Sequence, residues 1–256
     1  MLTKGELLEY KTWPNRYQLE KDYLQYIVLL EIFKRAKAGL VFKGGTALQK
    51  CYGLDRFSED LDFTANSEDE IKRVGESLQA LKQLYNSSFK KTEDERSVTF
   101  NLRIEGPLFE KQRSIQTIII EISRREKTLR DPVLIRLISK YRDLEAQLVV
   151  VMDKDEIMAE KTRALLTRRR PRDLYDIYFL LKKGAEIDFA LIGKKLEYYG
   201  VKFDPVLLSA RILDLKVIWD KELGILMERP PEFKEIADFV LKSFADAETR
   251  HKEQKR

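Results

Sequence analysis

Two aspartates separated by one residue are the first sign of chemistry in this chain. Asp60 and Asp62 alternate with Leu61 and Phe63 in the segment RFSEDLDF, residues 56–63. In a β-strand the side chains at i and i+2 point to the same side, so both carboxylates would face one way and both apolar side chains the other. Carboxylates held together repel each other unless a cation bridges them, and a site of oxygen ligands suits Mg²⁺. The pair therefore predicts a divalent-metal site.

A glycine pair precedes the aspartates. In KGGTAL, residues 43–48, Gly44 and Gly45 follow a short apolar run and precede a helix expected over residues 46–52. Glycine lets backbone N–H groups approach a phosphate closely, and the start of a helix adds partial positive charge. A tight turn is the plainer interpretation, and the chain lacks the full P-loop and G-x-G-x-x-G patterns. Beside a D-x-D strand, however, such a turn predicts a phosphate cradle next to metal ligands, an arrangement that suits two-metal phosphoryl transfer.

Two further charged residues fit this hypothesis. Glu121 lies at the end of a strand expected over residues 115–122 and is a candidate third metal ligand, although a charged residue at a strand end needs no such role. Lys161 lies on a helix expected over residues 153–168, from which its ammonium group would reach triphosphate oxygens as a point charge.

A basic turn and two more acids follow Lys161. Four arginines occur within residues 168–172, which is a phosphate-binding pattern if it is more than a solvated basic turn. Asp173 and Asp176 are at i and i+3 of the next helix and lie off its apolar stripe. The sequence thus concentrates its candidate chemistry in two regions, one before and one after residue 152.

Hydrophobic periodicity predicts the elements that must position these residues. Strands are expected over residues 40–42, 60–64, 98–104, 115–122 and 147–152, and helices over residues 16–37, 46–52, 67–85, 153–168 and 171–183. Residues 90–95 have the composition of a charged loop, residues 124–143 fit neither period, and the tail from residue 249 is expected to fray. Strands before residue 152 and helices after it predict an α+β protein, with a core domain at 1–152 and a helical domain at 153–256.

Composition narrows the possible functions. A net charge of +5 and a pI of about 9.0 fit an anionic partner, either a nucleotide or a nucleic acid. Cys51 is the only cysteine, which excludes an internal disulfide and favours the reducing cytoplasm. His251 is the only histidine, which argues against a histidine-based zinc site or a Ser-His-Asp hydrolase. No signal peptide or apolar run of membrane-spanning length is evident, so no membrane association is expected.

The motifs, taken in series, resemble those of a known family. GGTAL, RFSEDLDF, AEKTRALLTR and RDLYD occur in this order between residues 43 and 176. Together they resemble the AbiEii/AbiGii-type toxin nucleotidyltransferases, a branch of the DNA polymerase β-like nucleotidyltransferase superfamily. The resemblance implies a nucleotidyltransferase-type mixed β-sheet flanked by helices, with a helical C-terminal domain that completes the nucleotide site.

The resemblance also implies roles for single residues. The residues expected to bind the nucleotide are Gly44, Gly45, Thr46, Ser58, Lys161 and Asp176. Those expected to act in catalysis are Asp60, Asp62, Glu121, Lys161 and Asp173, of which the first three would bind the metal. Two positions depart from the superfamily pattern. The superfamily often has Gly-Ser where this chain has Gly45-Thr46 after Gly44, which shifts any hydroxyl contact by one position. The third acid is Glu121 rather than aspartate.

The implied activity is Mg²⁺-dependent transfer of a nucleoside monophosphate from an NTP to an acceptor. In some members of the family the acceptor is the 3′ end of tRNA, and the enzyme is a toxin paired with an AbiEi-like antitoxin. Two alternatives stay open at this point: a non-catalytic module that holds a nucleotide or a partner protein, and a transferase that modifies a small molecule such as an antibiotic. The choice of NTP, the acceptor and the oligomeric state are not evident from the sequence.

Overall fold

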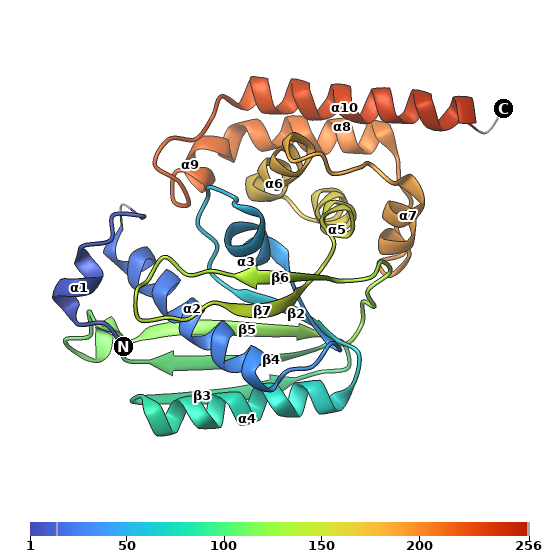
Figure 1. The fold of residues 1–256 in the computed structure, drawn as a ribbon. Coiled ribbons are helices and arrows are strands. Elements are labelled where there is room, and N and C mark those ends of the chain that lie inside the picture. Colours follow the sequence, from blue (N-terminus) through green and yellow to red (C-terminus); the bar gives the residue numbers. More distant parts are fainter. Residues whose placement is uncertain (14, 255–256) are drawn as a thin grey trace. The chain divides into compact units, whose positions relative to one another are not determined.

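The computed structural model describes residues 1–13 and 15–254 of the chain. The chain forms two compact units, residues 1–152 and residues 153–256 (Figure 1). The first unit contains all of the strands that the structure describes, and the second unit is built from helices. Among the described helices, none combines the length and the apolar character that a membrane crossing needs.

The first unit is organised around a seven-stranded mixed sheet. Its strands are β1 (Leu40–Lys43), β2 (Leu61–Ala65), β3 (Ser87–Glu93), β4 (Ser97–Ile104), β5 (Gln116–Ser123), β6 (Val133–Leu137) and β7 (Gln147–Val151). Across the sheet they follow the order β3-β4-β5-β2-β1-β7-β6. The pairs β2/β5 and β1/β7 are parallel, and the other neighbours are antiparallel. The prediction of an α+β protein with a mixed sheet is confirmed.

Two long helices, α2 (Arg16–Arg35) and α4 (Glu68–Leu84), pack together on the sheet. The other helical segments of the first unit are α1 (Lys4–Leu8), α3 (Gly44–Ala47), the π-helical turn η1 (Leu48–Tyr52) and the short η2 (Gln112–Ser114). Figure 1 shows α2 crossing the sheet and α4 running along β3. Residues 18–33 of α2 are all buried, because this helix lies in the core of the unit instead of on its surface. Phe33 of α2 packs against Phe63 of β2, with ring centroids 6.2 Å apart.

Two strands were not predicted from the sequence. Residues 90–95 were expected to be a charged loop, which is wrong for residues 90–93, because β3 covers Ser87–Glu93 at one edge of the sheet; residues 94–95 lie in the turn before β4, as expected. Only one end of β3 has inward side chains, where Phe89 packs on Phe100 with ring centroids 5.9 Å apart. Exposed lysines are common on edge strands, since they discourage pairing with another chain. Within the undecided residues 124–143, Val133–Leu137 forms β6 at the opposite edge.

The helix after the glycine pair also differs from its prediction. It begins at Gly44 and not at Thr46, so the two glycines form the first turn of α3. The chain continues directly into η1, which ends at Gly53 with a φ of 82°. The strand with the two aspartates begins at Leu61, one residue later than expected, so Asp60 directly precedes β2.

The second unit is an assembly of helices. They are α5 (Lys154–Thr167), α6 (Pro171–Lys182), α7 (Phe189–Glu197), α8 (Pro205–Asp214), the short η3 (Leu215–Ile218), α9 (Trp219–Leu223) and α10 (Phe233–Gln254). Helix α5 contacts α6, α7 and α8, and α6 contacts α9 and α10. The expected fraying from residue 249 is wrong for residues 249–254, which continue α10; residues 255–256 lie outside the described part. An ion pair between Lys252 and Glu248, 2.6 Å apart, supports this last turn.

Candidate active site

A row of polar residues crosses four strands of the sheet. Lys43 of β1 lies opposite Asp62 of β2, Asp62 lies opposite Glu121 of β5, and Glu121 lies opposite Thr99 of β4. Residues directly opposite each other on neighbouring strands have side chains on the same face. Phe63 packs on α2, so its neighbour Asp62 points to the opposite face. The fold therefore brings Asp62 and Glu121 side by side on the face away from α2.

Asp60 and Asp62 keep the alternation that the sequence predicts. Leu61 and Phe63 are fully buried, whereas Asp60 and Asp62 are half-buried. Asp60 lies outside the strand, so pairing with β1 or β5 does not fix its backbone. Its position depends on the loop that leads into β2.

Gly44 lies directly against the carboxyl group of Asp62. Its φ is +76°, a conformation in which residues with a side chain are strained. A β-carbon at Gly44 would also lie 3.0 Å from both Cβ and Cγ of Asp62, and closer still to its Oδ2. Glycine is thus required at this position for its backbone conformation and for the close approach of the acid.

Gly45 and Thr46 contact the loop that precedes Asp60. A β-carbon at Gly45 would lie 2.7 Å from Nη2 of Arg56 and 2.7 Å from Oγ of Ser58, which places Ser58 next to the glycine turn. Thr46 is fully buried, and its hydroxyl donates a hydrogen bond to the carbonyl oxygen of Asp60. The Thr46 hydroxyl therefore supports this loop from within the protein.

Lys43 and Glu126 form a buried ion pair that the sequence did not suggest. Lys43 Nζ lies 3.1 Å from Glu126 Oε2, and the side chains are 10% and 4% exposed. Lys43 directly precedes the glycine pair and belongs to the polar row beside Asp62. The position of Lys43 directly before the glycine pair could have indicated a role for this residue in the site. Glu126 lies in a segment without periodicity, so its pairing with Lys43 was not predictable.

The carboxylates of the first unit suit a cation that takes part of its ligands from the protein and part from a substrate. Within residues 1–13 and 15–254, no group of three or more His, Cys, Asp or Glu side chains is placed to hold a metal ion. Mg²⁺ commonly binds one or two carboxylates and takes its remaining ligands from water and substrate phosphates. Asp62, whose carboxyl group lies against the glycine turn, and Asp60, two residues before it, are the ligand types of that second kind of site.

The candidate residues of the second unit form one buried cluster. Lys161 Nζ lies 2.6 Å from Asp176 Oδ2 and 3.3 Å from Asp173 Oδ1. Arg168 adds a two-pronged contact to Asp173, from Nε to Oδ2 at 2.7 Å and from Nη2 to Oδ1 at 2.9 Å. Asp173 and Asp176 are fully buried although both lie off the apolar stripe of α6. The structure therefore brings Lys161, Asp173 and Asp176 together.

The charges in this cluster compensate one another. Burial alone would raise the pKa of Asp173, but the positive charge of Lys161 and the hydrogen bonds from Arg168 hold the pKa below its ordinary value. Asp173 is therefore ionised at neutral pH. An ionised acid with two cationic partners fixes the position of the Lys161 ammonium group.

The arginine-rich turn is exposed but not unstructured. The side chain of Arg168 is 45% exposed beside Asp173. Arg169 donates through Nη2 to the carbonyl oxygen of Asp214 at 2.6 Å, and Arg170 Nη1 lies 3.6 Å from Glu222 Oε1. These contacts hold a basic surface at the start of α6.

Comparison with known proteins decides the family. The chain matches the family "Nucleotidyl transferase AbiEii toxin, Type IV TA system" over residues 28–249. The chain belongs to the AbiEii family. No curated protein matches it.

Solved structures support the AbiEii assignment at the level of the fold. The nucleotidyltransferase toxin MenT4 of Mycobacterium tuberculosis H37Rv aligns with a TM-score of 0.72 at 24% identity, covering 96% of this chain and 89% of that chain. JHP933 from Helicobacter pylori aligns with a TM-score of 0.56 at 19% identity, covering 94% of this chain and 99% of that chain. The predicted resemblance to toxin nucleotidyltransferases is thus confirmed.

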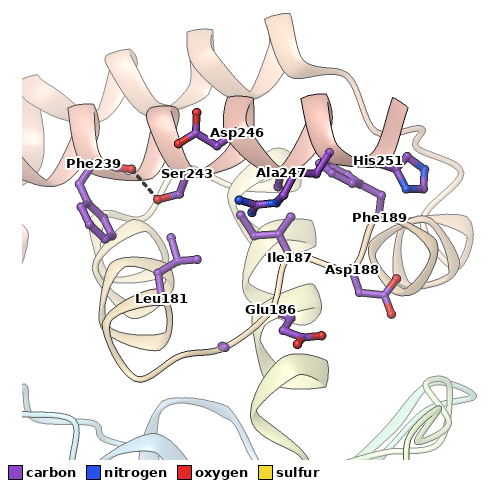
Figure 2. A pocket seen from close by; sticks show the side chains of 12 residues that line it. Leu181, Glu186, Ile187, Asp188, Phe189, Phe239, Ser243, Asp246, Ala247 and His251 are labelled. Carbon is purple, nitrogen blue, oxygen red and sulfur yellow. Dashed lines mark hydrogen bonds between the residues drawn. The ribbon is translucent and has the colours of Figure 1, made fainter. Parts of the chain in front are cut away.

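The second unit of this AbiEii-family chain also contains a cavity that the candidate residues do not line. The cavity has a volume of about 630 Å³ and lies between the connection from α6 to α7 and helix α10 (Figure 2). Apolar side chains such as Phe189 and Phe239 share its lining with scattered acids. The hydroxyl of Ser243 is engaged, since it donates to the carbonyl oxygen of Phe239 at 2.8 Å. Among its described lining residues are none of the predicted site residues.

Proposed function

We propose that this chain is a Mg²⁺-dependent nucleotidyltransferase that transfers the nucleoside monophosphate of an NTP to RNA, at the 3′ end of tRNA. The observation that carries the proposal is the contact of Gly44 with the Asp62 carboxyl group. It brings the first turn of α3, where backbone N–H groups have no partner within the helix, next to an acid suited to a metal. Membership of the AbiEii family supports the same activity.

In the first unit, three acids and a glycine turn would bind the metal and the phosphates. Asp60 and Asp62 would hold Mg²⁺ together with phosphate oxygens, and Glu121, opposite Asp62 in the sheet, would be the third carboxylate. Bound Mg²⁺ would offset the charge on the phosphates and orient the transferred group. The N–H groups of Gly44 and Gly45 would donate to the phosphates.

The other nucleotide-binding roles would fall to neighbouring side chains and to the second unit. Ser58 lies against Gly45, so we assign its hydroxyl to the phosphates. Lys161 would bind phosphate as a point charge whose position is fixed by Asp173 and Asp176.

The acceptor is assigned from charge. The exposed arginines of residues 168–170, together with a pI of about 9.0, favour a polyanionic acceptor over a neutral one. Transfer to tRNA would make the chain the toxin of a toxin–antitoxin pair acting in the cytoplasm, with an AbiEi-like antitoxin as its protein partner. MenT4, with which the chain shares its fold, is likewise named a nucleotidyltransferase toxin.

The test is a transfer assay with each of the four labelled NTPs, total tRNA and Mg²⁺. Wild type should label RNA, and both Asp60→Ala/Asp62→Ala and removal of Mg²⁺ by EDTA should abolish labelling. Glu59→Gln is the matched control, because it removes the acid directly before Asp60 and leaves both proposed ligands in place. Labelling that survives in the double variant would sink the assignment.

The same assay separates the two alternatives. Adding an aminoglycoside in place of tRNA tests a small-molecule transferase, for which the label would appear on the antibiotic and not on RNA. A non-catalytic module would bind NTP with no dependence on Mg²⁺ and would form no product with either acceptor.

A further inference from the structure

One buried amide on α2 holds two successive carbonyl groups of the loop before Asp60. Gln25 is fully buried, and its Nε2 donates to the carbonyl oxygen of Ser58 at 2.9 Å and to that of Glu59 at 2.8 Å. These two bonds use both hydrogens of the amide. Because Ser58 and Glu59 directly precede Asp60, Gln25 holds the backbone that carries the first of the two aspartates.

The carbonyl oxygen of the Gln25 amide, in contrast, does not bind the loop. Within the described part of the chain, Oε1 of Gln25 is buried and has no hydrogen-bond partner. A buried acceptor without a partner lowers stability. Gln25 is therefore a poor residue for packing alone, and the two bonds that it donates are what it adds to this position.

A second amide holds the same loop from the other side. The Oε1 of Gln49, in η1, accepts a hydrogen bond from the backbone N–H of Ser58 at 3.0 Å. Its Nε2 donates to Oδ1 of Asp22 at 3.0 Å, which fixes the orientation of the amide. Asp22 is itself held by Lys50 Nζ at 2.8 Å, so this amide has a rigid support.

Two residues already described complete the set. Arg56 donates through Nη1 to the carbonyl oxygen of Phe57 at 2.9 Å, and Thr46 donates to that of Asp60. Residues 57–60 lie in no strand or helix that the structure describes, yet side chains bind each of their four carbonyl groups. Side chains thus replace the ladder of a sheet for this segment.

We propose that Gln25 and Gln49 are positioning residues. They hold residues 58–60 in the conformation in which the Asp60 carboxylate binds the Mg²⁺ that is shared with the nucleotide. The inference rests on the proposed nucleotidyl transfer, because it assigns the two amides to that site. Neither amide touches a substrate in this scheme. Both act through the backbone of the loop, as a misplacement of about 1 Å can cost on the order of 10²-fold in rate.

The test compares Gln25→Met with Gln116→Met. Gln116 is a matched control: it is 2% exposed, its Nε2 donates to Glu20 Oε2 at 2.9 Å, and its Oε1 also lacks a partner in the described chain. Methionine keeps the length of the side chain and removes the donors in both cases. Two measurements are made on each full-length variant: amide hydrogen exchange of a peptide covering residues 57–62, and NTP transfer over a range of Mg²⁺ concentrations.

Gln25→Met should exchange faster in residues 57–62 and transfer about 10- to 100-fold more slowly or need correspondingly more Mg²⁺. Gln116→Met should match wild type in both measurements. Unchanged exchange, or unchanged transfer and Mg²⁺ dependence, in Gln25→Met would overturn the proposal. Gln49→Met supplies the same test with a half-buried residue, should Gln25→Met fail to fold.

Failure of the proposed function has a different signature. Wild-type protein that transfers no nucleotide under any condition refutes nucleotidyl transfer, and it also removes the role proposed for the amides in that reaction. The exchange measurement then still decides whether the two amides hold the loop. Faster exchange with normal transfer, in contrast, would retain the enzyme and refute the positioning role.

Discussion

The Asp62 carboxyl group lies against the bare Cα of Gly44, at the point where β1 passes into α3. A β-carbon at Gly44 would lie 3.0 Å from Cβ and from Cγ of Asp62. A side chain at position 44 would therefore displace the Asp62 side chain. The glycine is therefore fixed by the acid as well as by its own φ of +76°. This contact ties the turn proposed for the phosphates to the acid proposed for the metal.

Gly44→Ala should accordingly lose most of its transfer activity and be less stable than wild type. Strain from the positive φ costs about 1–2 kcal/mol, and displacement of the Asp62 carboxylate adds to it. Gly53→Ala is the control, because Gly53 has a φ of +82° and no atom within 4 Å of a β-carbon. Urea unfolding and NTP transfer of both variants separate backbone strain from displacement of the acid. Equal transfer by the two variants would contradict a role for the contact.

Asp62→Asn should affect the metal more than Glu121→Gln. Asp62 touches the glycine turn, whereas Glu121 is an exposed residue on the next strand. We expect both substitutions to lower transfer, Asp62→Asn by more than about 100-fold and Glu121→Gln by about 10- to 100-fold, because water replaces an exposed ligand more readily than one held against the glycine turn. Thermal unfolding with and without Mg²⁺ gives an independent readout, since a bound ion stabilises the folded state. Mg²⁺ should raise the midpoint of wild type but not of Asp62→Asn, and an equal rise in both would contradict the ligand role.

The sequence predicted those elements whose pattern reflects one buried face. In β4, Val98, Phe100, Leu102 and Ile104 alternate with polar residues, and all four are buried as expected. The edge strand β3 was missed because most of its side chains point to water, so its composition is that of a loop. For a strand whose ladder has a partner on only one side, the pairing and not the pattern determines the structure.

The candidate site was predictable in its residue types but not in its pairings. The D-x-D alternation and the glycine turn were evident, yet the row from Lys43 to Thr99 depends on the order and register of four strands that are distant in sequence. The complete burial of Asp173 and Asp176 was not evident either. Apolar periodicity assigns charged residues to the surface, whereas here Lys161 compensates for their burial.

Replacement of Lys161 should remove activity and stability together, and a second buried lysine separates the two effects. Lys161→Met leaves Asp173 and Asp176 buried without this partner, which typically costs about 3–5 kcal/mol. Lys195 is in a similar position in the same unit: it is fully buried, with Nζ 2.7 Å from Glu156 Oε1 and 2.9 Å from Glu160 Oε1.

Lys195→Met should therefore lose a similar amount of stability and retain transfer per folded molecule. Lys161→Met should lose both. Urea unfolding gives the folded fraction at the assay temperature, and transfer rates are divided by this fraction. If the corrected rates of the two variants are equal, the loss in Lys161→Met is one of folding, and Lys161 does not bind the nucleotide.

The ionisation of Asp22 should make the unfolding free energy of the protein depend on pH in the acid range. Burial raises the pKa of this carboxyl group, but the charges of Lys50 and Lys140 outweigh burial and lower the pKa from its ordinary 3.8 to about 2. Since the pKa is lower in the folded state than in the unfolded state, the stabilisation is present above pH 4 and is lost as the pH falls towards 2. Asp22→Asn lacks this titration. At pH 7 it should be less stable by about 3–5 kcal/mol, because Lys50 stays buried beside an uncharged partner.

The gap in unfolding free energy between wild type and Asp22→Asn should then narrow by roughly 2 kcal/mol between pH 5 and pH 2. Urea unfolding of both proteins at each pH measures it, and the comparison at equal pH cancels the titration of the other groups. A gap that stays constant over this range would mean that Lys50 and Lys140 do not lower the pKa of Asp22 in the folded protein. A gap that widens would mean that burial dominates, since Asp22 would then take up its proton more readily when folded than when unfolded.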